Sequence, residues 1–492
     1  MHKSTTIKHL VAIAIALLFS LQNSLGQDNI YKAISDAEKT VFTTTTYNRG
    51  GGVIGKSAGF FIGSSGLAIV RASIFVGADS IKIIDSRNLQ LKVERVVAVH
   101  QPSDLAMVKI ISDRKSNFNF LFPSSSIFTE NEELLIFSEP ELGEDGVQIE
   151  KINQILEKPV LNRLGILKTN MGYNSTASPA INSKGELVGI TGYLKPETPS
   201  FLYSCAILSD TNWVNLNVPT KKLKESVLKQ AYMAPHLSKG LLSYAFQDWI
   251  GAAKNFTSYL AVFNNSALGF AFRGYARYMY NNKEESKRDF AAARLLSSTS
   301  LYAFYFEALI AIQEGKKEKA YKLIDSSVYY QFRFPQARVL RGNLTLETNR
   351  PHNDALLDYS YAIQVDNNYA EGYYYRAQYL RKYTKNFDLA YSDMGKCIIL
   401  NPSLPNAYII KGEMDIEHEN FFEAQKNMNN AVRKDPDNAE ALFTRGLVNY
   451  HLGLKRDACN DWKKSSDLGN EKALSYLLRF CKSEQLTKSI YE

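Results

Sequence analysis

The sequence contains few of the residues that build metal centres and disulfide scaffolds. Its 492 residues include 4 cysteines, 3 tryptophans and 7 histidines. So few cysteines in a long chain exclude a disulfide-dense fold. The glycine-rich stretch 50–55 lacks the Lys-Ser/Thr pair of a phosphate loop and predicts a hairpin loop instead. The histidines lack the spacing of metal ligands, so we expect no metal and no cofactor. Those after residue 218 are His236, His352, His418 and His451.

The chain also lacks a strong charge of one sign. Its 58 basic and 50 acidic residues give a net charge of +8, and no run of five like charges occurs. Such a mild excess does not imply nucleic-acid binding. A hydrophobic content of 45% excludes a disordered or collagen-like chain. What is plentiful is aromatic residues, with 29 Tyr and 26 Phe.

Long apolar runs are missing as well. Residues 10–21, LVAIAIALLFSL, are almost entirely apolar but too few to span the hydrocarbon core of a membrane. They follow a basic start and precede the small residues Ser24 and Gly26, as in a secretory signal peptide. We predict a signal peptide over residues 1–26, cleaved after Gly26, and an exported protein, periplasmic or secreted. An uncleaved anchor is the alternative. No later segment predicts a membrane span.

Residues 35–218 predict an all-β domain. Short segments rich in β-branched and aromatic residues alternate with turns that contain Gly, Asn and Ser. Examples are GFFIG, LAIVRASIFV, SIKIID, LKVERVVAV and ELVGITGY. Their regular spacing favours a barrel or a sandwich.

Three motifs in this region resemble trypsin-like serine proteases of the HtrA/Deg type. Residues 59–66, GFFIGSSG, look like the family's glycine-flanked strand, and the GAD turn at 77–79 follows its histidine strand. Residues 104–110, DLAMVKI, look like the aspartate segment. Residues 174–190, NSTASPAINSKGELVGI, look like the nucleophile loop and the following hairpin. The motifs occur in the family's order, so the resemblance implies a trypsin-like double barrel over about residues 38–218.

The resemblance also implies where the catalytic residues should lie. The aspartate is present as Asp104, but the histidine position falls on Ser73 and the serine position on Thr176. Asn174 and Ala177 replace two glycines of the nucleophile loop. A hydroxyl needs an adjacent base to become a nucleophile, and serine cannot serve as that base. We therefore expect an inactive pseudoprotease, not an enzyme.

Two alternatives remain open for this domain. The resemblance could be accidental, or the domain could be a protease that uses Thr176 with Asp104 or a lysine as its base. His100 lies four residues before Asp104 and cannot reach the position of Ser73 without refolding the strand. Cys205 has no histidine in a family position and is interpreted as a buried structural cysteine.

Residues 236–482 contain a repeat, which a helix over residues 219–235 connects to the β domain. A small residue follows a charged one at positions 240, 274, 308, 342, 377, 412 and 446, in steps of 34 or 35 residues. A second, mostly alanine column and a third column of large apolar residues follow each of these positions. This period, with small residues where two helices cross, is the tetratricopeptide (TPR) signature. It predicts an all-α solenoid of seven repeats, with single insertions near Pro351 and Lys385.

The predicted groove of this solenoid is rich in tyrosine. The first helix of each repeat lines the concave face, through positions one and four after the small residue and three and six before it. Tyrosine offers a large contact area and a hydroxyl, which suits a peptide or a partner helix. The alternative is that these tyrosines pack between repeats. The predicted peptide-binding residues are Tyr244, Tyr275, Tyr278, Tyr302, Tyr305, Tyr374, Arg381 and Tyr450, with Ile312 and Ile409 beside them.

The end of the array predicts a capping helix over residues 471–480. The terminal repeat resembles that of secreted TPR proteins from the Bacteroidetes group. Cys459 and Cys481 lie 22 residues apart on helices expected to be adjacent, so a disulfide between them is favoured over four free thiols.

Together these features predict an exported, non-catalytic scaffold that binds a protein or peptide partner through the TPR groove. The degenerate barrel would be a second binding surface or a spacer. The alternative function is a serine-type protease with remodelled catalytic residues, whose repeats recruit the substrate.

Overall fold

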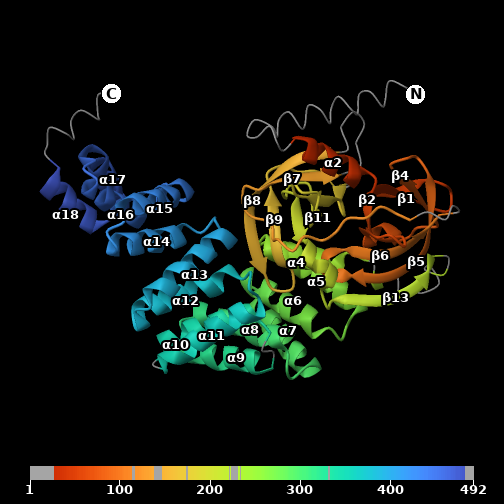
Figure 1. The fold of residues 1–492 in the computed structure, drawn as a ribbon. Helices are drawn as coiled ribbons and strands as arrows, with labels where there is room; N and C mark the ends of the chain where they lie inside the picture. Colours follow the sequence, from red (N-terminus) through yellow and green to blue (C-terminus); the bar gives the residue numbers. More distant parts are fainter. Residues whose placement is uncertain are drawn as a thin grey trace. The chain divides into compact units, whose positions relative to one another are not determined.

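The computed structural model describes residues 27–112, 117–137, 147–172, 175–220, 222, 231–232, 234–330, 333–348 and 350–481 (Figure 1). The predicted signal peptide, Asn174 and most of the connecting helix lie outside the described residues. The chain divides into two compact units, residues 1–314 and 315–492.

The first unit opens with a helix and an antiparallel barrel. Long strand β5 pairs with β4 at its start and with β6 along the rest of its length, which closes six strands into a barrel, and β13 pairs with residues 95–100 of β5. Large apolar side chains fill the barrel, among them Phe42, Phe75 and Val108. The elements are α2 (Gln27–Glu38), β1 (Val41–Tyr47), β2 (Val53–Gly63), β3 (Leu67–Arg71), η2 (Ala72–Phe75), β4 (Ser80–Asp85), β5 (Gln90–His100), η3 (Gln101–Ser103), β6 (Leu105–Ile111) and β13 (Trp213–Pro219).

A second closed barrel follows, in the strand order β10-β11-β12-β9-β8-β7. Phe128, Ile136 and Leu202 lie in its core. Phe60 of the first barrel and Leu135 of the second belong to one buried cluster, which joins the two barrels. The strands are β7 (Glu133–Phe137), β8 (Val147–Lys158), β9 (Asn162–Leu167), β10 (Pro179–Ile181), β11 (Leu187–Gly192) and β12 (Phe201–Ser204), with the short helix η5 (Cys205–Ser209) after them.

Helical hairpins complete the first unit, after the predicted end of the β domain at residue 218. Leu237 and Leu241 of α4 belong to the same buried cluster as Leu164 and Phe201 of the second barrel. This apolar contact makes the first helices part of the same compact unit as the barrels, up to Glu314. The helices are α4 (His236–Ala245), α5 (Trp249–Val262), α6 (Ala267–Met279), α7 (Lys283–Leu296) and α8 (Leu301–Gln313).

The second unit continues the alternation of helices. A π-helical turn, η7 (Leu380–Thr384), and the left-handed Lys385 (φ 55°) accommodate the insertion expected near Lys385. The helices are α9 (Lys317–Tyr330), α10 (Pro335–Glu347), α11 (His352–Val365), α12 (Ala370–Tyr379), α13 (Phe387–Leu400), α14 (Pro405–Glu417), α15 (Phe421–Lys434), α16 (Ala439–His451), α17 (Lys455–Asp467) and α18 (Glu471–Phe480). The all-β double barrel followed by all-α TPR-type repeats confirms the predicted fold class.

The small residues that recur every 34 or 35 positions lie where the two helices of a repeat cross. A side chain at Gly342 of α10 would come within 2.6 Å of the Tyr359 ring on α11, and Gly446 of α16 faces Trp462 of α17 in the same way. The large apolar residue of the second helix in each repeat therefore packs directly onto the small residue of the first helix. This contact explains the steady repeat period.

Where the charged residue before the small one is an arginine, it has a partner that the sequence did not reveal. Arg376 donates to both carboxylate oxygens of Asp393, at 2.7 and 2.8 Å, across a helix pair in which the aspartate is buried. The aspartate follows 16 or 17 residues after the arginine, and this spacing is the signal that could have found it. Removing one partner of such a buried pair costs about 3–5 kcal/mol. The equivalent pairs are Arg273–Asp289, Arg341–Asp358 and Arg445–Asp461.

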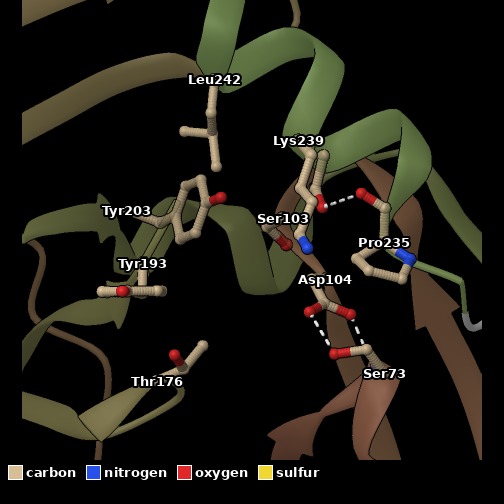
Figure 2. Close-up of a pocket in the computed structure, with 11 residues that line it drawn as sticks. Ser73, Ser103, Asp104, Thr176, Tyr193, Tyr203, Pro235, Lys239 and Leu242 are labelled. Carbon is tan, nitrogen blue, oxygen red and sulfur yellow. Dashed lines mark hydrogen bonds between the residues drawn. The ribbon is translucent and has the colours of Figure 1, made fainter. Parts of the chain in front are cut away.

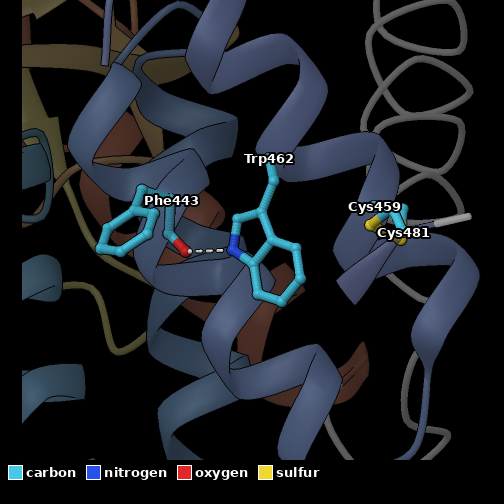
Figure 3. Close-up of a disulfide and its surroundings, with 4 residues drawn as sticks. All are labelled: Phe443, Cys459, Trp462 and Cys481. Atoms are coloured by element: carbon cyan, nitrogen blue, oxygen red, sulfur yellow. Dashed lines mark hydrogen bonds between the residues drawn. A yellow bond between two sulfur atoms is a disulfide. The ribbon is translucent and has the colours of Figure 1, made fainter. Parts of the chain in front are cut away.

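The last helix covers the end of the second unit. In the structure a disulfide joins Cys459 of α17 to Cys481, directly after α18, with 5.9 Å between the Cα atoms. Trp462 is fully buried beside it and donates through its indole N–H to the Phe443 carbonyl at 3.2 Å (Figure 3). The predicted capping helix thus has an apolar inner face against the terminal repeat.

A glycine pair in the second unit tests the helix crossings. Gly342→Ala should destabilise the protein by about 1–2 kcal/mol, because overpacking against the buried Tyr359 ring outweighs the gain of about 1 kcal/mol in helix propensity. The control is Gly395→Ala in α13, where the nearest atom is the flexible Lys411 Nζ at 3.7 Å. It should stabilise the protein by up to about 1 kcal/mol. Urea unfolding followed by circular dichroism measures both; a neutral Gly342→Ala would contradict the close crossing.

Candidate functional site

The three positions taken from the protease resemblance lie around one small cavity in the first unit (Figure 2). Ser73 lies in η2 directly after β3, Asp104 ends η3, and Thr176 lies in the turn before β10. Asp104 has a left-handed backbone (φ 56°), which turns the chain sharply into β6. The structure therefore brings together the residues that the sequence motifs singled out.

Ser73 and Asp104 are joined by two hydrogen bonds. The Ser73 backbone N–H donates to Asp104 Oδ1 at 2.8 Å, and its hydroxyl donates to Oδ2 at 2.6 Å. The carboxylate thus holds the proton of the hydroxyl that stands at the histidine position. No histidine is among the described residues that line this cavity. The geometry provides a hydrogen-bonded pair there, not a base.

Thr176 is placed on the opposite side of the cavity and is 5% exposed. Its carbonyl accepts a hydrogen bond from Ser57 Oγ at 3.0 Å. The next residue, Ala177, is fully buried with a φ of 66°, a conformation that favours glycine. The nucleophile turn keeps its glycine-type backbone although the glycine itself has been replaced.

A helix from the first repeat closes this cavity. Ser238, Lys239 and Leu242 of α4 line it together with the barrel residues. The remaining space has a volume of about 10 Å³, about the room of one water molecule.

Lys239 brings a charge into the site that sequence reasoning missed. Its ammonium group points toward the Asp104 carboxyl (Figure 2). Burial raises the pKa of Asp104 to about 6, although the hydrogen bonds from Ser73 and the positive charges of Arg71 and Lys239 act to lower it. Lys239 is the charged residue that precedes the small residue of the first repeat. The spacing of the protease motifs does not indicate that it lies in this site. Only the packing of α4 on the barrels reveals it.

A second group of polar side chains in contact with one another lies next to the site. Ser103 Oγ is 2.7 Å from His100 Nδ1, and His100 Nε2 is 3.5 Å from Asp210 Oδ2. These residues have the chemistry of a nucleophile, a base and an acid. However, Ser103 and His100 are each 1% exposed, and the Trp213 ring packs on the imidazole. We therefore interpret these contacts as structural, because they connect η3 with the end of η5.

Cys205 behaves as a structural residue. It is buried, and its thiol lies 3.6 Å from the Ser124 carbonyl oxygen. Burial raises the pKa of the Cys205 thiol, which disfavours the reactive thiolate.

Two of the predicted groove tyrosines are core residues instead. Tyr244 and Tyr275 are each 8% exposed and pack around Phe306, with ring centroids 5.7 and 4.6 Å away. Burial raises the pKa of both tyrosines. They are not groove residues, because their rings pack on each other and on Phe306 of α8, which is the alternative of tyrosines that pack between repeats. Tyr302 and Tyr305 pack half-buried against that cluster, and Tyr278 is half-buried.

In the second unit, Tyr450 also packs inside the fold. Its ring lies 5.7 Å from Trp462 and 5.0 Å from Phe480 of the capping helix. Tyr374 and Arg381 remain half-buried and partly accessible. Arg381 forms ion pairs with Glu413 at 2.7 Å and Glu417 at 2.5 Å. The predicted groove around Arg381 is therefore more polar than its many predicted tyrosines suggested.

The described residues contain no group of three or more His, Cys, Asp or Glu side chains that could hold a metal ion. No helix among them is both long and apolar enough to cross a membrane.

No protein-family model matches the chain, and no curated protein matches it. Solved structures resemble its two parts. An HtrA-type protease with a tripeptide is 14% identical over 37% of this chain and 61% of that chain, with a TM-score of 0.32. The Rv3671c protease of M. tuberculosis in its active form is 12% identical (36% and 81% covered, TM-score 0.31). YrrB, described as a TPR protein with an unusual peptide-binding site, is 18% identical (39% and 97% covered, TM-score 0.31).

At these low TM-scores the fold assignment rests on the strand order and the helix pairing themselves. By both, the chain is a trypsin-like double barrel followed by TPR-type helical repeats.

Two tyrosines on α6 separate core from surface. Tyr275→Ala should destabilise the protein by about 3 kcal/mol, because it leaves a cavity in the aromatic cluster. Tyr278→Ala, three residues further on and half-buried, should cost less than about 1 kcal/mol. Urea unfolding of both variants checks this; equal losses would contradict the placement of Tyr275 in the core.

Proposed function

We propose that this protein is a non-catalytic interaction scaffold, in which the protease-like barrels support repeats that bind a protein or peptide. One observation carries the proposal: α4 occupies the cleft at the triad positions, over the bonded Ser73–Asp104 pair. The barrels gain a structural role from the same contact, since they bury the apolar face of the first repeat.

The chemistry of the cleft supports the absence of catalysis. Losing one member of a Ser-His-Asp triad lowers the rate by several orders of magnitude, and here two positions have changed. Thr176 carries a branched side chain and is nearly buried. A substrate would first have to displace α4, at the cost of exposing Leu237 and Leu241.

The binding role is assigned to the second unit. Tyr374 and Arg381 offer an aromatic surface and a fixed charge on neighbouring turns, and Glu413 adds acceptor oxygens. Such a mixed surface suits an extended peptide, which needs hydrogen-bond partners as well as apolar contact. YrrB, with its peptide-binding site, is consistent with this role for TPR-type repeats.

The proposal includes export to the bacterial envelope. The signal-peptide pattern of residues 1–26 motivates it. The Cys459–Cys481 disulfide supports it, because such bonds persist in oxidising compartments.

A remodelled protease is the second candidate, and Lys239 is the observation that favours it. A lysine can serve as the base for a hydroxyl nucleophile. Here, however, the Lys239 ammonium points toward Asp104, on the side of the cavity away from Thr176 (Figure 2).

A protease assay decides between the two candidates. The purified chain should not cleave unfolded casein, and Thr176→Ala should leave that baseline unchanged. Restoring the triad with Ser73→His and Thr176→Ser should still give no turnover, because α4 covers the cleft. Cleavage by the wild type that Thr176→Ala abolishes would refute the proposal.

A binding assay tests the second unit. Peptides selected from a random displayed library against the wild type should bind Tyr374→Ala and Arg381→Ala about tenfold more weakly, since both remove partly accessible contact groups. Arg433→Ala is the matched control, because this arginine is exposed on α15 and pairs only locally with Asn430. Equal affinity of all three variants would exclude this surface as the binding site.

A further inference from the structure

The basic residues that precede the small residues in the second unit contact second helices. Arg341, Arg376 and Arg445 each form an ion pair with a buried aspartate on the second helix of the same repeat. On α14 this position is Lys411, whose ammonium nitrogen lies 4.7 Å from the centroid of the Tyr391 ring on α13. These positive charges therefore lie against the second helices and are not available on the opposite side of the first helices.

Carboxylates occupy the predicted groove positions of the same first helices. Glu371 of α12 and Glu440 of α16 each lie six residues before the small residue, and both are exposed. Glu413 of α14 directly follows the small residue Gly412, and Glu417 lies one turn further on. The side chains of Glu413 and Glu417 are 32% and 43% exposed. We call these four glutamates, with Arg381 and Tyr374, the acidic face.

The acidic face has more negative than positive charge. Arg381 of η7 pairs with Glu413 Oε2 at 2.7 Å and with Glu417 Oε1 at 2.5 Å, so one guanidinium serves two carboxylates. Within the part of the chain that the structure describes, no other basic side chain pairs with either of them, and none pairs with Glu371 or Glu440. Four carboxylates and one guanidinium leave three negative charges on this face, whereas the whole chain has a net charge of +8.

Given the proposed function, on which this inference depends, we propose that the acidic face binds an extended peptide that carries lysine or arginine. Arg381 holds Glu413 and Glu417 in place and compensates one of their two charges. A basic side chain of the peptide can compensate the other through a charge-assisted hydrogen bond. Tyr374, half-buried at a predicted groove position of α12, offers a ring on which the aliphatic part of that side chain can pack.

An acidic peptide fits this face less well. Arg381 is its one cation among the described residues, and the guanidinium already donates to both glutamates. An acidic side chain at Arg381 would therefore lie close to two carboxylates, and such like-charge contacts are costly at an interface. The charge balance thus favours a basic ligand.

Selection of a displayed random peptide library against the full chain tests the class of peptide. From a library with equal numbers of basic and acidic residues, the recovered sequences should contain at least about threefold more Lys and Arg than Asp and Glu. The net charge of +8 makes this result specific, because non-specific attraction to the whole chain would enrich acidic peptides.

The affinity of one recovered basic peptide then locates the site. It should bind Glu413→Gln/Glu417→Gln about tenfold more weakly than the wild type, and its wild-type affinity should fall at high salt. Glu284→Gln/Glu423→Gln is the matched control, because it removes two glutamates from second helices, where each pairs only with a lysine three residues away. This control should bind as the wild type does. Circular dichroism verifies that both double variants are folded.

A recovered pool without an excess of basic residues would overturn the inference. A basic peptide that binds Glu413→Gln/Glu417→Gln as tightly as the wild type would overturn it as well. Failure of this inference and failure of the proposed function are distinguishable. Neutral or acidic peptides that lose affinity in Tyr374→Ala would refute the basic ligand and support the binding role, whereas a library that yields no binding peptide would refute both.

Discussion

The apolar contact between the second barrel and the first repeat is the interaction on which the rest of this structure depends. Leu164, Phe201 and Tyr203 on the barrel share one buried cluster with Leu237, Leu241 and Leu242 on α4. Burying six such side chains contributes of the order of ten kcal/mol before conformational entropy is subtracted. This contact places α4 over the cleft and makes the first helices part of the barrel unit.

The changes in the cleft make sense as consequences of that contact. Under the proposed function a histidine at position 73 would have no substrate to act on, whereas the serine found there gives Asp104 two hydrogen bonds. The aspartate remains as an anchor for the turn between η3 and β6 and faces Lys239. In the proposed function, the protease-like architecture supports the repeats.

Much of the fold could be predicted from the sequence, because local patterns carry it. The strand segments, the family motifs and the repeat period each depend on neighbouring residues or on a fixed spacing. Ser73, Asp104 and Thr176 were brought together for the same reason, since their motifs fix their places on the barrel strands. The recurring small residues likewise predicted the helix crossings at Gly342 and Gly446.

What the sequence could not show depends on contacts between distant elements. Lys239 enters the cleft only because α4 packs on the barrel. Tyr244 and Tyr275 occupy predicted groove positions, yet their rings pack on Phe306 of the neighbouring repeat and are buried. The Arg376–Asp393 type of pair recurs at a spacing of 16 or 17 residues, but the arginines alone do not reveal which carboxylate each one meets.

The packing of the first repeat on the second barrel is the central claim, and a double-mutant cycle tests it most directly. The Phe201 and Phe246 rings, one on β12 and one at the end of α4, have centroids 5.9 Å apart. The free energies of unfolding of Phe201→Leu, Phe246→Leu and the double variant should reveal a coupling of about 0.5–1.5 kcal/mol. Strictly additive losses would show that the two rings do not meet in solution, and would contradict the account.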